Sequence, residues 1–399
     1  MVAREEIRCK GGFVGNDMRF IENFSLYFED GKILAIDEHV NEVDSDLIAV
    51  PAFINGHVHV ADSFMKDITF HGDLASIVAP PDGLKHQMLS KVSRKVMQLE
   101  IVKTLESMVR SGTILFIDFR EGGLDGCMKA LQAFHSARHP SMAVMLGRPG
   151  KRIGAIRAMI AAAPQLECFR GFNISSPNGW NDQLLEEFRS ALKQNPRLIL
   201  GTHVAETRKN VVKSKDRYKM SDASRLLSVL KDQATRAHLV HCNFLDGGDI
   251  DLIRRAGSSV ILCPRVASLF GNIDVEHPPY MELVESGITC CLGTDNVMLN
   301  VPDMFHELNF TTRLFKMLYP GWEFPPSLIL QMATINPARL IGIDRCAGSL
   351  EKGKDASFFL LDGSHHRFSN TRNVLASLLL RAGNADIHQV YMHGRRGLG

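Results

Sequence analysis

A run of apolar residues that ends in two histidines, His57 and His59, most restricts how this chain can fold. Alternate residues of a β-strand point to the same side, so a His-x-His pair at a strand end directs two imidazole nitrogens at one point. Taken alone, the pair is equally well explained as two polar residues at a strand end. Three later apolar segments end in His203, His241 and Asp295, and this repetition predicts a metal site built from several strand ends.

Predicted strands and helices alternate between residues 51 and 342. The strands are apolar throughout, as expected when both faces are buried in a parallel sheet. They comprise the segment ending at His59 and residues 114–119, 142–146, 171–174, 198–203, 238–241, 259–263 and 289–292. Eight such strands are the number of a (β/α)8 barrel, whose reaction centre lies at the carboxyl ends of the strands. The ligand-type residues all lie at these ends.

The two ends of the chain predict a second, smaller unit. Short strands surround an Asp-Gly turn at residues 30–31, and similar strands return near the carboxyl terminus. We therefore expect residues 1–50 and 346–399 to pair into one small β-sandwich, with residues 51–345 forming the barrel between them.

The charge and cysteine content narrow the class of protein. Lys and Arg number 46 against 44 Asp and Glu, a net charge of +2 without a basic tail. This balance predicts neither nucleic-acid nor membrane binding, and no apolar run reaches the length of a membrane span. The eight cysteines show no Cys-x-x-Cys spacing, which indicates reduced, mostly buried thiols. We expect a cytoplasmic protein whose partner is a small molecule.

The ordered motifs of the chain resemble those of the amidohydrolase superfamily, in its mononuclear aminohydrolase branch. That branch includes cytosine, guanine and adenosine-type deaminases and triazine hydrolases. The resemblance spans nearly the whole chain and implies a metal-bearing (β/α)8 barrel with a β-sandwich made from both chain ends. The matching pieces are Asn-Gly-His57-Val-His59, Thr-His203-Val-Ala-Glu206-Thr, Val-His241-Cys-Asn, Cys-Pro-Arg265, Gly-Thr-Asp295-Asn, Ala333-Thr-Ile-Asn-Pro-Ala338 and the glycine-rich run from Gly348 to Ala356.

The resemblance also implies a role for each ligand-type residue. The four side chains His57, His59, His203 and Asp295 would hold one divalent ion, commonly zinc and in some members iron. Binuclear members bridge two metals with a carboxylated lysine at the end of strand four. The corresponding residues 171–176 contain no lysine, so we expect a mononuclear site.

Two further residues would act beside the metal. Glu206 would shuttle protons, and His241 would either complete the coordination or hydrogen-bond the attacking water; the sequence leaves both roles of His241 open. A divalent ion can lower the pKa of a bound water toward about 7, and Asp295 can accept the proton released. Glu206 can then protonate a substrate nitrogen. Alternatively, Glu206 is a first-turn carboxylate favoured by a helix dipole.

Three arginines, Arg120, Arg148 and Arg265, directly follow barrel strands. A guanidinium fork suits a carboxylate or a phosphate, so one or two of them are candidates for binding an anionic substrate group. Each arginine could instead pair with a neighbour such as Glu121.

The long loop after the first strand predicts a substrate lid over residues 61–86. His71 and His86 on this loop are candidate substrate contacts, and Asn296 beside Asp295 is another. Loop histidines are more often solvated.

These features favour a metal-dependent deaminase of an amino-substituted nitrogen heterocycle, such as a nucleobase, nucleoside or pterin. Opening of a cyclic amide or displacement of chloride from a similar ring is the enzymatic alternative. A scaffold without catalysis is the alternative of another class, although the complete ligand set argues against it. The resemblance also suggests homo-oligomers.

Overall fold

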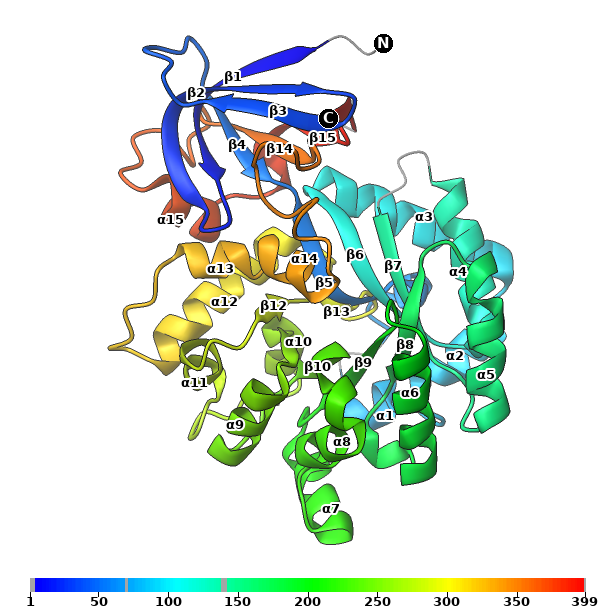
Figure 1. Cartoon of the computed structure of the whole chain (residues 1–399). Helices are drawn as coiled ribbons and strands as arrows, with labels where there is room; N and C mark the ends of the chain where they lie inside the picture. Colours follow the sequence, from blue (N-terminus) through cyan, green and yellow to red (C-terminus); the bar gives the residue numbers. More distant parts are fainter. Residues whose placement is uncertain (1–3, 69–70, 138–141, 398–399) are drawn as a thin grey trace. The chain divides into compact units, whose positions relative to one another are not determined.

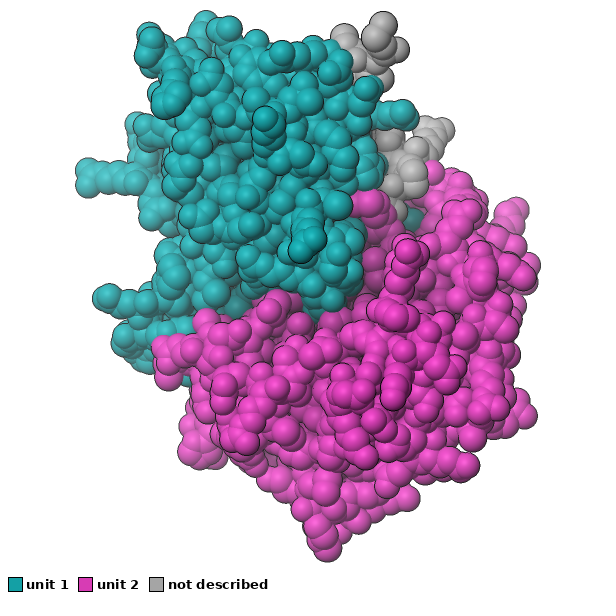
Figure 2. Space-filling model, viewed as in Figure 1, with its two compact units in different colours: residues 1–55, 105–115, 303–399 teal, residues 56–104, 116–302 magenta. Residues whose placement is uncertain are grey.

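The computed structural model describes residues 4–68, 71–137 and 142–397 of the chain. Its internal contacts define two compact units, which Figure 2 shows in different colours. One unit comprises residues 1–55, 105–115 and 303–399, and the other comprises residues 56–104 and 116–302. Each unit is thus assembled from segments far apart in the sequence. The domain boundaries at residues 50 and 345 stay a prediction.

Parallel strands with helices between them form the predicted (β/α)8 barrel (Figure 1). All residues of β6, β9 and β10 are buried, because such strands contact the barrel interior on one side and helices on the other. The strands are β5 (Phe53–His59), β6 (Thr113–Arg120), β7 (Met142–Gly147), β8 (Phe169–Ile174), β9 (Ile199–Val204), β10 (Ala237–His241), β11 (Ser259–Leu262), and an eighth strand split into β12 (Cys290–Leu292) and β13 (Asp295–Asn296).

The split eighth strand closes the barrel. Its first half, β12, pairs with β11, and its second half, β13, pairs with β5, the first strand of the ring. Gly293 lies between the halves, and a Cβ atom there would lie only 2.6 Å from the Cβ of His57. A glycine is therefore required where the eighth strand passes the first metal-type ligand.

In the described residues, eleven α-helices and several short 3-10 helices accompany the barrel strands. Polar side chains begin several of them; Asn181, for example, accepts a hydrogen bond from the backbone N–H of Leu184 at the start of α6. None of the helices in the described residues is long and apolar enough to cross a bilayer. The α-helices are α1 (Leu74–Val78), α2 (Leu84–Lys91), α3 (Arg94–Arg110), α4 (Gly123–Ser136), α5 (Ile153–Ala162), α6 (Asp182–Gln194), α7 (Arg208–Tyr218), α8 (Asp222–Leu230), α9 (Gly247–Ala256), α10 (Pro264–Leu269) and α11 (Tyr280–Glu285).

The segment predicted as a long loop after the first strand contains short helices. A 3-10 helix follows β5 directly, and α1 and α2 come next. Asp73 begins α1 by accepting from the backbone N–H of Ser76, at 2.8 Å. Ile77 of α1 is buried against Met65 and Met298. Local capping and this apolar cluster give the segment more order than its polar composition indicates.

The other unit contains a seven-stranded sheet in the order β16-β15-β14-β4-β1-β2-β3. Strand β4 pairs antiparallel with β14, which places Val50 opposite Phe359. Both chain ends therefore share one sheet, and the predicted small β unit built from the two termini is confirmed. The strands are β1 (Glu5–Val14), β2 (Arg19–Glu29), β3 (Lys32–Asp37), β4 (Leu47–Pro51), β14 (Phe358–Asp362), β15 (Ile387–Met392) and β16 (Arg395–Arg396).

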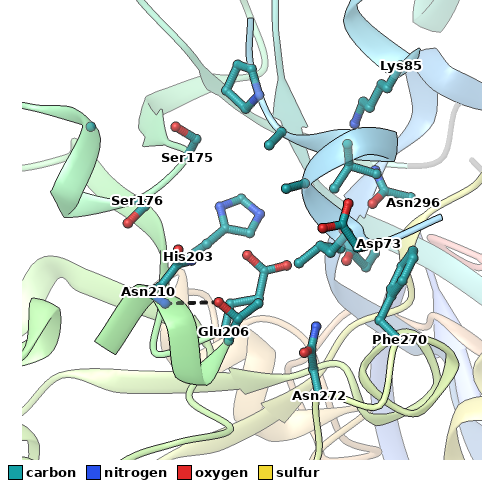
Figure 3. A pocket seen from close by; sticks show the side chains of 18 of the residues that line it. Asp73, Lys85, Ser175, Ser176, His203, Glu206, Asn210, Phe270, Asn272 and Asn296 are labelled. Carbon is teal, nitrogen blue, oxygen red and sulfur yellow. Dashed lines mark hydrogen bonds between the residues drawn. The ribbon is translucent and has the colours of Figure 1, made fainter. Parts of the chain in front are cut away.

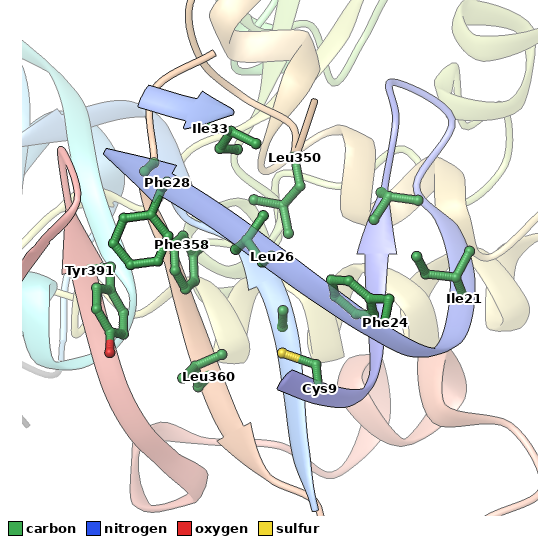
Figure 4. Packing of buried hydrophobic residues seen from close by; sticks show 13 residues of the cluster. Cys9, Ile21, Phe24, Leu26, Phe28, Ile33, Leu350, Phe358, Leu360 and Tyr391 are labelled. Atoms are coloured by element: carbon green, nitrogen blue, oxygen red, sulfur yellow. The ribbon is translucent and has the colours of Figure 1, made fainter. Parts of the chain in front are cut away.

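An apolar cluster covers one face of this sheet (Figure 4). Phe358 stacks on Tyr391 with ring centroids 4.7 Å apart, and Phe28 meets the Phe358 ring edge-on at 5.7 Å. Strands from both chain ends thus contribute to one core. The same unit holds α12 (Met304–Leu318), α13 (Ser327–Gln331), α14 (Ile335–Leu340) and α15 (Val374–Leu380).

Candidate metal-dependent active site

Four buried side chains converge at the carboxyl end of the barrel. His57 and His59 end β5, His203 lies near the end of β9, and Asp295 begins β13. One ligand atom from each lies within 4.8 Å of the others. The Oδ1 atom of Asp295 is 3.1 Å from Nε2 of His57 and 3.4 Å from Nε2 of His59. Three imidazoles and one carboxylate around a single point are a donor set suited to a zinc-type divalent ion.

Outer partners fix the orientation of two of these imidazoles. The Nδ1 atom of His59 lies 2.8 Å from Oε1 of Glu121, and Nδ1 of His203 lies 3.3 Å from the carbonyl oxygen of Ile174. A proton held at Nδ1 leaves the Nε2 lone pair available to a metal. Burial also lowers the pKa of His57 to about 3, so this imidazole is neutral, as metal ligation requires. The residues present therefore fit a bound divalent ion.

The backbone is strained where the site is built. Ala205, His241 and Asp295 adopt positive φ angles of 46°, 73° and 61°. Residues with a Cβ atom rarely adopt this left-handed conformation, and each instance costs about 1–3 kcal/mol. The surrounding barrel sustains this cost at three strand ends that carry or precede the proposed functional side chains. We interpret the strain as part of what aims these side chains at one point.

Glu206 and His241 lie beside the four ligands. Oε1 of Glu206 is 3.4 Å from Nε2 of His241, which is 3.9 Å from Oδ2 of Asp295. Figure 3 shows the Glu206 carboxyl and the His203 ring pointing into the same pocket. Burial and then the Asp295 carboxylate raise the pKa of Glu206 to about 8. A carboxyl group in this position can carry a proton to a substrate bound near the ligands.

A network of buried charges supports the ligands from the side of β6. Glu121 contacts Nζ of Lys85 at 2.7 Å and a terminal nitrogen of Arg120 at 2.7 Å. Lys85 also contacts Asp62 at 3.2 Å, and both Lys85 and Asp62 are nearly inaccessible to solvent. From the sequence, no site role is predicted for Lys85 or Asp62, and Glu121 is expected only as a possible partner of an arginine. Glu121 directly follows a barrel strand and could have been found by that position, whereas nothing local marks Lys85 as buried.

A cavity of about 770 Å³ opens over the ligands. Arg148 and Asn296, two of the predicted substrate contacts, line it. The side-chain amide of Asn296 donates to Asp62 at 2.8 Å, so Asn296 is held by the charge network. Lys85 and Asn296 lie across the pocket from Ser175 and Ser176 (Figure 3).

The other predicted substrate contacts do not line this cavity in the described residues. Arg120 is buried and donates to Glu121. This is the pairing with a neighbour that the sequence allowed as the alternative, and it corrects the expectation that Arg120 contacts the substrate. Arg265 donates to the carbonyl oxygen of Val301 at 3.1 Å. His71 is exposed and His86 is half-buried, and neither belongs to the cavity lining.

The model of the amidohydrolase family matches residues 48–397. The chain belongs to the amidohydrolase family. A putative aminohydrolase of Methanothermobacter thermautotrophicus is 33% identical over 351 residues, covering 85% of this chain and 86% of the relative. A 5'-deoxyadenosine deaminase of Methanosarcina mazei is 25% identical, covering 94% and 88%. The zinc complex of atrazine chlorohydrolase from Arthrobacter aurescens has a TM-score of 0.84 at 16% identity, covering 98% and 94%.

Membership of the amidohydrolase family confirms the predicted enzyme class, a hydrolase that acts on carbon–nitrogen bonds other than peptide bonds. The buried cluster of three histidines and one aspartate agrees with the predicted metal dependence. The structural likeness confirms the barrel fold. The individual residue roles stay predictions.

Proposed function

We propose that this amidohydrolase is a zinc-dependent deaminase that replaces the amino group of a nitrogen heterocycle by hydrolysis and releases ammonia. The observation that supports it most directly is the position of Glu206. Its carboxyl group lines the same cavity as the ligands His59, His203 and Asp295. Deamination needs both an activated water and a proton donor for the departing nitrogen, and this cavity provides a place for each.

Each of these side chains has its own role in the proposed reaction. When bound, a divalent ion held by His57, His59, His203 and Asp295 supplies Lewis acidity that lowers the pKa of a water toward about 7. Asp295 accepts a proton from the attacking water, and His241 orients that water by a hydrogen bond. Glu206 protonates a ring nitrogen, takes up the proton of the added hydroxyl group as the carbonyl forms, and passes that proton to the departing ammonia. The proton that Asp295 took from water then returns Glu206 to its protonated state. The cavity walls hold the ring in place.

Displacement of chloride or opening of a cyclic amide is the second candidate. The solved atrazine chlorohydrolase shares the fold, and a fold alone does not fix the leaving group. Chloride leaves as an anion without a proton, so a proton donor such as Glu206 is of less use in that reaction. The named relatives, an aminohydrolase and a deaminase, also favour deamination.

Metal analysis and ammonia release test the proposal together. We expect purified protein to carry about one zinc ion per chain and to release ammonia from at least one member of a panel of aminopurines, aminopurine nucleosides, pterins and cytosines. His203→Ala should lose both metal and activity. His135→Ala is the matched control, because His135 is exposed on α4 and pairs with Glu167 away from the cavity lining. Metal-loaded protein that releases chloride from chlorinated rings but no ammonia from the panel would contradict the proposal.

A further inference from the structure

Arg148 stands at the cavity with a fixed orientation. Its Nε donates to Oδ1 of Asn173 at 2.8 Å. The amide of Asn173 in turn donates to the backbone carbonyl oxygens of Arg120 and Leu146, which holds Asn173 itself in place. An arginine anchored through Nε keeps its two terminal nitrogens free to form the paired hydrogen bonds that carboxylates and phosphates accept.

The hydrogen-bond partner of the Arg148 guanidinium is a neutral amide. Among the described residues, none places a carboxylate oxygen in an ion pair with its guanidinium, and Asn173 is its neutral partner. Glu121 is the acid that influences Arg148 electrostatically. Both oxygens of Glu121 already contact cations, Lys85 and Arg120. An arginine on a cavity wall without its own acid is suited to an anion from outside the protein.

Three lysines extend this positive region toward the mouth of the cavity. Lys151 follows β7 by four residues, and Lys209 and Lys213 lie four residues apart on α7, hence on one face of that helix. In the part of the chain that the structure describes, none of the three forms an ion pair. The hydroxyl groups of Ser175 and Ser176, which are neutral hydrogen-bond donors, line the same wall.

The balance of charge along the lining is positive. The ion pair between Lys85 and Glu121 is internally compensated, and Asp295 belongs to the ligand set with Glu206 beside it. The remaining charged groups are four cations and one carboxylate, that of Asp73. Asp73 caps α1, where it accepts from Ser76, and its carboxylate also interacts electrostatically with Lys209. Arg148, Lys151 and Lys213 remain as the cations that form no ion pair with the other described lining residues. The excess of cations is therefore available to a ligand.

We propose that the substrate is an amino-substituted heterocycle that carries an anionic oxygen group, a phosphate or a carboxylate, bound by Arg148 with Lys151, Lys209 and Lys213 around it. This inference rests on the proposed deaminase function and names its substrate class. The cavity size agrees, because about 770 Å³ accommodates a ligand well beyond a bare ring. The ring lies over the metal ligands, and the anionic arm extends toward the mouth.

Binding of inorganic phosphate tests the anion site without any turnover. We expect the zinc-loaded protein to bind phosphate in calorimetry at millimolar concentration, and Arg148→Met to weaken this binding by at least about tenfold, the loss of charge-assisted hydrogen bonds. The double variant Lys209→Met/Lys213→Met changes exposed side chains and should also weaken binding without disturbing the fold. Lys215→Met is the matched control, because Lys215 lies on the same helix but pairs with Asp246 outside the cavity.

Phosphate bound equally well by wild type and all variants would place the ion on the metal and overturn the anion site. Absence of phosphate binding by wild type would overturn it as well.

Matched substrate pairs then separate this inference from the proposed function. Adenosine with adenosine 5'-monophosphate tests a phosphate, and 5'-methylthioadenosine with S-adenosylhomocysteine tests a carboxylate. We expect ammonia release with kcat/KM at least about tenfold higher for the charged member of one pair, a ratio that falls in Arg148→Met and is kept in Lys215→Met. Ammonia released equally from neutral and charged members would overturn the anionic substrate and leave deamination standing. Phosphate binding lost in the variants, without ammonia from any compound, would overturn deamination and leave the anion site standing.

Discussion

The barrel mouth and the terminal sheet bury opposite kinds of side chain. At the mouth, Lys85, Asp62, Arg120 and Asp118 are almost completely inaccessible to solvent. The cluster on the sheet consists of apolar and aromatic residues such as Phe28 and Phe358. The interior of the protein is thus largely charged at the barrel mouth and largely apolar at the terminal sheet.

The difference shows where this protein accepts an energetic cost. Apolar burial stabilises a fold by about 25 cal/mol per Å² removed from water, whereas a buried ion pair often stabilises no more than an apolar replacement. The sheet is stabilised by apolar burial, and this burial joins the two chain ends. The charges at the mouth lie beside the proposed metal ligands, because Glu121 of this network is 2.8 Å from Nδ1 of His59.

The largest expected effect concerns the barrel mouth. Glu206→Gln keeps the size of the side chain but removes the proton donor, so we expect kcat to fall by about a thousandfold. Zinc content measured by mass spectrometry should stay at the wild-type level, because Glu206 is not a proposed ligand. A variant that loses its zinc along with activity would place Glu206 in the coordination shell instead.

A cavity in the sheet core should affect stability without affecting the metal. Phe358→Ala removes a fully buried ring that contacts Phe28 and Tyr391, and we expect a loss of about 4 kcal/mol. Each unit contains one tryptophan, Trp322 in the sheet unit and Trp180 in the barrel unit.

Urea unfolding of Phe358→Ala should therefore be followed in a Trp180→Phe background, where fluorescence reports on Trp322. An unchanged midpoint would show that the aromatic cluster does not stabilise this unit. Loss of zinc from the folded variant would break the contrast between the two regions.

Two buried lysines, one in each region, allow a matched comparison. Lys85→Met leaves the buried carboxylates of Glu121 and Asp62 without their cation, so we expect a loss of about 3 kcal/mol. Lys354→Met in the terminal unit should cost about 1 kcal/mol, because its partner Glu351 is 36% exposed and can be rehydrated. Urea denaturation of both variants measures the difference. Equal losses would show that burial of the partner does not determine the cost.

His238 is a polar residue of the barrel wall for which we find no chemical use. Both ring nitrogens lack a hydrogen-bond partner among the described residues, and burial lowers its pKa to about 3. In the unfolded chain a histidine has a pKa near 6.5. At a pH between about 3 and 6.5, His238 is therefore protonated in the unfolded chain but not in the folded protein. Wild type therefore loses stability as the pH falls, and His238 contributes about 1 kcal/mol of that loss between pH 7 and 5.5.

His238→Leu should remove this contribution. The expected outcome is a smaller stability difference between urea titrations at pH 7 and 5.5 than in wild type. His135→Leu, at an exposed position, should keep the wild-type difference. The same pH dependence in His238→Leu and wild type would show that His238 gains a partner or solvent in solution.

The sequence predicted the parts of the site that depend on local pattern. Apolar strands with a period of two place the side chains of His57 and His59 on one side, and the order of the strands places His203 and Asp295 at the same end of the barrel. The structure brings these four together as predicted. The same reasoning could not find Lys85, because its burial depends on acids 23 and 36 residues away in the chain.

Arg120 and Arg148 show where the sequence stops being sufficient. Arg120 ends β6 and Arg148 directly follows β7, so the local pattern makes both equally good candidates for a substrate contact. Arg120 forms an ion pair with Glu121, whereas Arg148 donates to Asn173, which lies on a different strand, and so remains at the cavity. The sequence by itself determined the barrel, the joined termini and the placement of the metal-type side chains at one end of the barrel, since these follow from the periodicity and order of the strands. The resemblance to a known family implied which four of these side chains form the ligand set. Only the tertiary structure decided which charges neutralise one another and which remain for a ligand, because ion pairs form between side chains whose proximity no local pattern encodes.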